Sequence, residues 1–354
     1  SRSGSTLSLH RLLGNAVRHL EGSTSSARFA VIEMIVQHLP NDPTAAFTME
    51  SSHVLARLGT WIPCMRSVLC DDLDELISQM NDAWRTRGHN MVRVLSFFLG
   101  FESNFGTMDV GASSDMAEAL LRLIQRFLQP RDPWALSATA TYTFACVLEQ
   151  QQTRGEDALL HALEASKPFF DPVDRTYLQA QTVLGYVWCF MCHRQARLGQ
   201  YFSEMMPKWQ QLGDSVKVSE CVRLQYLRMA WAGNFKEAVD MVDAHSEVLF
   251  RPGSYFTIAN MLQACWVIQR HGDPERIQAA LPMRDQVIQL HSDMNVAINA
   301  DKISTYLQRA AGNSGGKFCM FKLLSLLCVP TWLGESMFSQ VHGMKHGVFT
   351  SFGF

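Results

Sequence analysis

Two groups of cysteine and histidine residues have spacings that could bind a metal ion or carry out redox chemistry. Cys189 and Cys192 form a Cys-x-x-Cys pair followed by His193, a pattern found in redox couples and in halves of zinc sites. This pair lies in an apolar stretch without a second pair at a matching distance, so we expect core packing. The second group has eight residues between its cysteines, too many for a zinc finger, and comprises Cys319, Cys328, His342 and His346. We predict no metal site.

Patterns for nucleotide binding and catalysis predict no site in this chain. The sequence has no GxxxxGK[ST] loop, and "GNSGGK" at Gly312–Lys317 lacks the first glycine at the required spacing and has Phe318 after the lysine. A G-x-S-x-G nucleophile turn is also missing. Acidic residues cluster where a helix is expected to begin, and there they favour the helix dipole: Asp71, Asp72, Asp74 and Glu75. We predict no catalytic residue and no cofactor held by this chain alone.

His10 is the one residue to which a chemical role can be tied. The alternating run Thr6–Leu9 predicts a short strand, and an amphipathic helical pattern starts directly after His10 and Arg11. Histidine can donate a hydrogen bond to phosphate and titrates near neutral pH. On these residues alone, the simpler interpretation is a histidine at the start of a helix.

Most of the chain shows helical periodicity. Apolar residues recur at i, i+3, i+4 and i+7 from Met116 to Leu128, with Asp115 before them and Pro130 after them. The same reasoning predicts helices over Ala27–His38, Asp72–Arg87, Leu136–Gln152, Ala158–Lys167, Asp174–His193, Tyr201–Leu212, Val216–Ala232, Lys236–Val248, Tyr255–Arg270, Glu275–Leu290 and Val296–Ala310. Helices of this length with short connections predict an all-α array of hairpins or a bundle.

Three stretches share a register of small and aromatic residues and favour the array. They contain Ala158, Ala162 and Ala165; Leu184, Gly185 and Trp188; and Gly233 and Ala238. A small residue on one helix lets its partner approach closely, and an aromatic side chain fills the neighbouring gap. The features resemble tetratricopeptide repeats, which implies a superhelix of helical hairpins.

The opening segment then resembles the winged-helix part of NB-ARC (NLR-like, STAND) nucleotide-switch ATPases of fungal type. The matching residues are Leu9, His10, Arg11, Leu12, Leu13, Ala16, Val17 and Arg18, and "ARFAVIEMIVQHLPND" is similar to the helix that follows. In that family the histidine contacts the β-phosphate of ADP, so the resemblance implies this role for His10 if an NB-ARC domain precedes this chain. Arg11 departs from the acidic residue of the plant-type motif, and Gly14 from the usual glutamine.

The composition of the chain limits which partners it can bind through charge and indicates the cellular compartment. The net charge is −2, which argues against binding nucleic acid or acidic membranes through bulk charge. Nine cysteines without a framework, and no Asn-x-Ser/Thr acceptor, favour a reducing, cytoplasmic setting. The one membrane-like stretch, Phe318–Leu333, is short for a spanning helix and contains Lys322 and Pro330. We expect no membrane partner.

These patterns divide the chain into three predicted regions. Residues 1–70 are predicted to form a winged-helix-like remnant with connecting helices, residues 71–311 the tetratricopeptide-like array, and residues 312–354 an irregular apolar tail. Gly316-Lys317 can be encoded by a splice-donor sequence, so we interpret the tail as a gene-model artefact. A hydrophobic anchor is the alternative interpretation. Transcript reads that code through this junction would refute the artefact.

The expected function is recognition of a protein or peptide on the concave face of the array. The chain would be the non-catalytic sensor region of a nucleotide-switch signalling ATPase whose intact form could oligomerise, and this sequence would be a fragment of it. A stand-alone helical-repeat scaffold or regulatory module is the alternative. An enzyme with an unrecognised helical active site is the third class.

Overall fold

A computed structural model describes residues 25–45, 73–82, 84–105, 110–148, 151–190 and 195–251. Shorter pieces are described between residues 61 and 69 and between 260 and 276. All regular secondary structure in these residues is helical, which confirms the all-α prediction. The predicted strand Thr6–Leu9, the remainder of residues 1–24 and the apolar tail 312–354 lie outside the described residues. None of the described helices is both long enough and apolar enough to cross a membrane.

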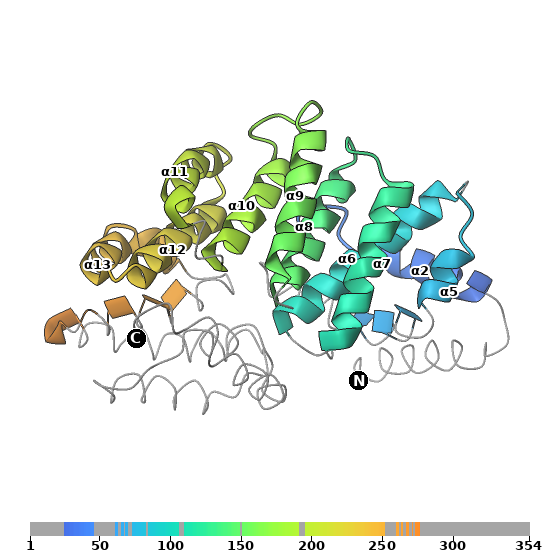
Figure 1. Cartoon of the computed structure of the whole chain (residues 1–354), viewed down its shortest axis with the longest axis horizontal. Coiled ribbons are helices and arrows are strands. Elements are labelled where there is room, and N and C mark those ends of the chain that lie inside the picture. The colour runs from blue at the N-terminus through green and yellow to red at the C-terminus, as the bar shows by residue number, and fades with distance from the viewer. Residues whose placement is uncertain are drawn as a thin grey trace, which may run out of the picture. The chain divides into compact units, whose positions relative to one another are not determined.

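The chain divides into two compact units, which are described separately. The helices of the first unit are α2 (Ser25–His38), α5 (Leu73–Ser78), α6 (Arg85–Phe105), α7 (Val110–Phe127), α8 (Pro133–Leu148), α9 (Gln152–Ser166) and α10 (Arg175–Phe190). The helices of the second unit are α11 (Gln195–Gln211), α12 (Ser215–Trp231), α13 (Phe235–Ala244) and the short α14 (Ser246–Leu249). Figure 1 shows these elements along the chain.

In the first unit, consecutive helices pack as hairpins around α8. Helix α8 packs against α7, α9 and α10, and α10 also packs against α9 (Figure 1). Every residue of α8 from Trp134 to Thr143 is buried, although the segment contains a serine and three threonines. Thr139 and Thr143 donate to the carbonyl oxygens four residues earlier, at 2.8 Å each, so these hydroxyls stay satisfied in the core.

The close approach between α8 and α9 is at Gly155. A β-carbon there would lie 3.0 Å from the Cβ atom of Cys146 and 3.0 Å from the carbonyl oxygen of Thr143, and the Thr143 hydroxyl donates to the Gly155 carbonyl at 3.0 Å. The prediction that Ala158, Ala162 and Ala165 allow this approach is wrong, because all three are partly exposed. The buried face of α9 is formed by Gly155, Glu156, Leu159, Leu163 and Ser166.

In the second unit, two turns with the same chemistry join three helices. Gly213 and Gly233 end α11 and α12 with positive φ angles of 68° and 84°, a conformation that glycine adopts without strain. The next residue, Asp214 or Asn234, donates its N–H to the carbonyl five residues earlier and begins the following helix. These turns let α12 pack against both α11 and α13. Ala238 is fully buried, as the repeat register predicts, whereas Gly233 is an exposed turn residue.

The helices repeat along the sequence at a regular interval. Helices α8, α10 and α12 begin at residues 133, 175 and 215, and the alternating helices α9, α11 and α13 begin at 152, 195 and 235, a spacing of about 40 residues. Helices therefore recur along the described part of the chain, as expected from the sequence, and within each unit consecutive helices pack against one another. The predicted superhelical winding stays a prediction.

One predicted element is wrong and another was missed. The structure has no single helix over Asp72–Arg87; α5 ends at Ser78 and a separate 21-residue helix, α6, begins at Arg85. Helix α6 is apolar on several faces, with Met91, Val92, Leu95 and Phe98 all fully buried. A helix buried on several faces has no apolar stripe to reveal it in the sequence.

Candidate functional site

Most of the residues singled out in the sequence lie outside the residues that the structure describes. His10, the "GNSGGK" stretch, Cys192, His193 and the C-terminal group Cys319, Cys328, His342 and His346 lie outside the described residues. Cys189 belongs to α10, but its side chain is not described. The roles proposed for these residues therefore stay predictions.

One smaller prediction can be checked. Asp74 and Glu75 lie in the first turn of α5, the position expected from the helix dipole, and Asp74 also forms an ion pair with Arg122 of α7. Among the residues that the structure describes, no three histidine, cysteine or acidic side chains are grouped so that they could hold a metal ion.

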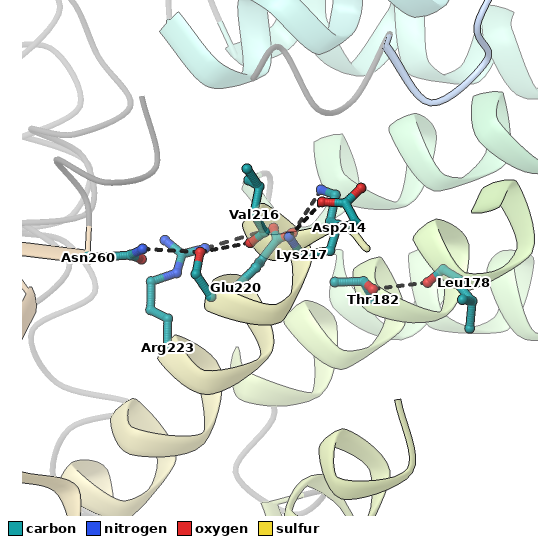
Figure 2. A network of polar contacts seen from close by, with 9 residues as sticks. Leu178, Thr182, Asp214, Val216, Lys217, Glu220, Arg223 and Asn260 are labelled. Carbon is teal, nitrogen blue, oxygen red and sulfur yellow. Dashed lines mark hydrogen bonds and ion pairs between the residues drawn. The ribbon is translucent and has the colours of Figure 1, made fainter. Parts of the chain in front are cut away.

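The most unusual chemistry in the second unit is a row of charged side chains on the buried helix α12. Lys217, Glu220 and Arg223 lie on successive turns of this helix (Figure 2). The Lys217 ammonium is 2.8 Å from one Glu220 carboxylate oxygen, and the Arg223 guanidinium is 3.9 Å from the other. The side chains of Lys217 and Glu220 are each only 1% exposed, and that of Arg223 is 6% exposed. Glu220 thus lies between two cations almost without contact with solvent.

Local contacts position this row. The Asp214 side chain accepts a hydrogen bond from the backbone N–H of Lys217 at 3.1 Å and so caps the start of α12. A cation in the first turn of a helix is disfavoured by the helix dipole, and the nearby carboxylates of Asp214 and Glu220 offset this effect for Lys217. Removing charges of this kind from water is costly unless they are paired, which explains why they occur together.

Asn260 connects α12 to the chain that follows. Its side-chain amide donates to the Leu249 carbonyl at 3.0 Å and to the Ser219 hydroxyl at 3.3 Å, while Tyr226 donates its hydroxyl to the Asn260 carbonyl at 3.2 Å. Ser219 in turn donates to the Val216 carbonyl at 2.7 Å. Figure 2 shows Asn260 beside the charged row. The network therefore fixes the register between α12, the end of α14 and residue 260.

Cys221 lies in the same helix turn but is poorly suited to nucleophilic chemistry. Burial is the largest cause that raises the pKa of its thiol, and the Glu220 carboxylate raises this pKa further, while Lys217 lowers it. The thiolate is the reactive form of cysteine. In its buried state this thiol stays protonated, so the network acts through charge and hydrogen bonds rather than through Cys221.

A second cluster, in the first unit, surrounds Trp134 at the start of α8. His89, Arg93 and Phe97 recur every four residues on α6, and all three side chains contact the Trp134 ring. Their ring or guanidinium centres lie 6.3, 5.1 and 5.9 Å from it, respectively. An arginine over an aromatic face gains a cation–π interaction. This stripe therefore holds α6 against the beginning of α8.

Asp132 caps α8 and joins this cluster. One of its carboxylate oxygens accepts from the Trp134 N–H at 2.9 Å, and the other is 3.4 Å from Nε2 of His89. Burial raises the pKa of Asp132, but the hydrogen bond from His89, the Trp134 N–H and the charge of His89 together outweigh burial, so the pKa lies below its ordinary value. We call Asp132, His89, Arg93 and Trp134 the Trp134 cluster.

Neither cluster was singled out from the sequence, although both carry a sequence signal. In the α12 segment, "KVSECVR" places charges at i, i+3 and i+6 within an apolar helix, which puts them on one face. In the first unit, Asp132-Pro133 is a typical helix start, with an acidic N-cap followed by proline. The predicted start at Leu136 overlooked that signal.

The chain was compared with known protein families and with curated proteins. No model of a known protein family matches the chain, and no curated protein matches it significantly.

Proposed function

We propose that this chain is the recognition region of a nucleotide-switch signalling ATPase, with the helical array as its sensor for a protein or peptide. The observation that carries the proposal is the repetition of helices about every 40 residues, with two turns in the second unit that both contain a glycine of positive φ. Arrays of this kind present extended surfaces on which partners bind.

The charged row on α12 would support such an array from within, since the side chains of Lys217 and Glu220 are each only 1% exposed and that of Arg223 is 6% exposed. Its pairing, together with the contacts of Asn260, fixes the helices of the second unit. The recognition surface itself would be formed by the exposed side chains of the helices.

The nucleotide part of the proposal rests on the resemblance around His10. In the parent protein, His10 would donate to the β-phosphate of ADP and hold the closed state, and partner binding on the array would shift the protein out of that state. The cytoplasmic location predicted from cysteine usage and the lack of glycosylation acceptors agrees with such a role.

The release of ADP from the parent protein tests this assignment. His10→Ala should increase the rate of ADP dissociation by about tenfold or more, because a charge-assisted hydrogen bond to phosphate is lost. His161→Ala is the matched control, since His161 is an exposed histidine of α9 and should leave the rate unchanged. Equal rates in wild type and the His10→Ala variant would refute the role of His10.

A further inference from the structure

Residues 39–45, which follow α2, are held by side chains from two separate helices of the array. Arg93 of α6 donates through Nη2 to the Pro40 carbonyl at 3.3 Å and to the Asn41 side-chain oxygen at 3.0 Å. Ser137 of α8 donates its hydroxyl to the Pro43 carbonyl. Since Arg93 also contacts the Trp134 ring, one arginine links the turn to both α6 and the start of α8.

The turn itself is stiff. Pro40 and Pro43 each fix a backbone φ angle. Between them, a carboxylate oxygen of Asp42 accepts from the backbone N–H of Thr44 at 2.9 Å and from its hydroxyl at 2.8 Å. Asp42 also accepts through its carbonyl from the Ala45 N–H at 3.1 Å. A turn constrained in this way transmits a movement rather than absorbing it.

Helix α2 is fixed independently at its other end. Phe29, Ile32 and Ile35 are each at most 1% exposed, and the Phe29 ring packs edge-on against Trp84 at 5.7 Å. Arg28 donates to the Val68 carbonyl, and Arg87 of α6 pairs with Glu33 at 3.2 Å. Helix α2 therefore packs in the core of the first unit and is not a linker helix.

We infer that the Arg93–Trp134 contact, with Ser137, forms a rigid joint that fixes residues 39–45, and with them the C-terminal end of α2, to α6 and α8. A movement of α6 and α8 as a body then carries α2 with it. The regulatory meaning of this joint rests on the proposed function, because α2 follows the segment that contains His10. Under the proposed function, a displacement of α6 and α8 would therefore be carried as far as the start of α2 at Ser25.

Hydrogen–deuterium exchange of the full chain tests the joint. Arg93→Ala should accelerate exchange of the amides of residues 39–45 by about tenfold or more, because the contacts that hold the turn are lost, while the amides of α9 keep their protection. Ser137→Ala should act in the same direction with a smaller effect. Arg131→Ala, at an exposed arginine just before the Trp134 cluster, is the matched control and should change neither region.

Arg93→Lys keeps the charge but loses the planar group, so it separates stacking from charge alone and should also accelerate exchange in the turn. Unchanged exchange of residues 39–45 in both Arg93→Ala and Ser137→Ala would overturn the inference. Equal acceleration in α9 would overturn it as well, since Arg93 would then support the whole unit rather than a joint. The experiment uses no nucleotide, so its failure leaves the sensor proposal standing, and loss of the sensor proposal leaves the joint intact.

Discussion

Single side chains in this protein carry charges into the core, and their cost explains how they are arranged. Lys217 and Glu220 are buried as a close pair, whereas the pair Lys236–Asp240 on α13 has a lysine that is 76% exposed. Charges in water gain little from pairing, while a buried charge that loses its partner is strongly unfavourable. A lysine–carboxylate pair therefore contributes differently to stability in the two places.

Replacement of Lys217 by methionine should lower the free energy of unfolding by about 3–5 kcal/mol, because the Glu220 carboxylate loses its nearest cation in a buried site. Urea unfolding measures this loss. The double variant Lys217→Met/Glu220→Met should be less destabilised than Lys217→Met alone, since both charges of the pair are removed together. Lys236→Met is the surface control and should unfold close to wild type; a similar loss in both lysine variants would contradict the account.

Asp132 should make stability depend on pH in the acid range. Its pKa in the folded protein lies below the ordinary value of 3.8, so the folded state favours the carboxylate. The stabilisation is therefore complete above the unfolded pKa and is lost as the pH falls through the folded pKa.

The difference in unfolding free energy between wild type and Asp132→Asn should consequently be near its full value at about pH 5 and should shrink below about pH 4. Chemical unfolding at a series of pH values measures it. A difference that stays the same down to pH 2 would show that the Asp132 charge plays no part.

At the scale of helices, close approach depends on a few glycines. A β-carbon at Gly88 of α6 would lie 2.2 Å from the Phe127 ring at the end of α7, closer than any side chain tolerates. At Gly199 of α11, the nearest atom would be the end of the flexible Arg228 side chain at 3.3 Å. Both positions are helical glycines, but only the first is packed against a rigid ring.

Gly88→Ala should therefore destabilise the protein by about 1–3 kcal/mol, the usual cost of overpacking, despite the better helix propensity of alanine. Gly199→Ala should be neutral or slightly stabilising for the same propensity reason. Thermal unfolding compares the two. Equal melting temperatures in the two variants would contradict the packing of α6 against Phe127.

At the turn glycines, the backbone conformation rather than close packing requires glycine. Gly233 has a φ angle of 84° and open space around its α-carbon, so the cost of a side chain there is conformational rather than steric. Gly233→Ala should cost about 1–2 kcal/mol, measured by urea unfolding. Ala232→Ser, next to it in the same turn with an ordinary φ angle, should have little effect; an equal loss in both variants would contradict the argument.

The sequence predicts amphipathic helices well and buried ones poorly. Helix α7 shows an apolar stripe from Met116 to Phe127 and lies where it was expected. Helix α6 is buried on several faces, so its apolar residues follow no period, and it was missed. Likewise, the register of small residues suggested alanines of α9 as the close contact, whereas the neighbouring Gly155 is the residue that α8 touches. Which residues are buried, and against which neighbours, depends on the packing of helices far apart in the sequence. The sequence pattern of one helix does not contain this information.

The Trp134 cluster and the charged row on α12 show the same limit. The Trp134 cluster joins α6 to α8 across more than 40 residues of sequence, so its members have no common motif. The charged row on α12 is local and could have been found from its i, i+3, i+6 spacing. The part that depends on long-range packing, the link through Asn260, could not.

For the molecule as a whole, the described residues form two units of packed helices, and each unit has a polar network that involves a buried helix. The helices recur about every 40 residues, and α2 is fixed to α6 and α8 through the Trp134 cluster and residues 39–45.

The genomic and transcript sequence upstream of Ser1 tests the central claim most directly. The sensor proposal predicts an in-frame segment with a GxxxxGK[ST] loop between a strand and a helix, encoding the phosphate-binding part that this chain lacks. A start codon immediately upstream, with no ATPase in frame, would contradict the proposal. His10 would then be a histidine at a helix start, and the protein a stand-alone helical-repeat scaffold.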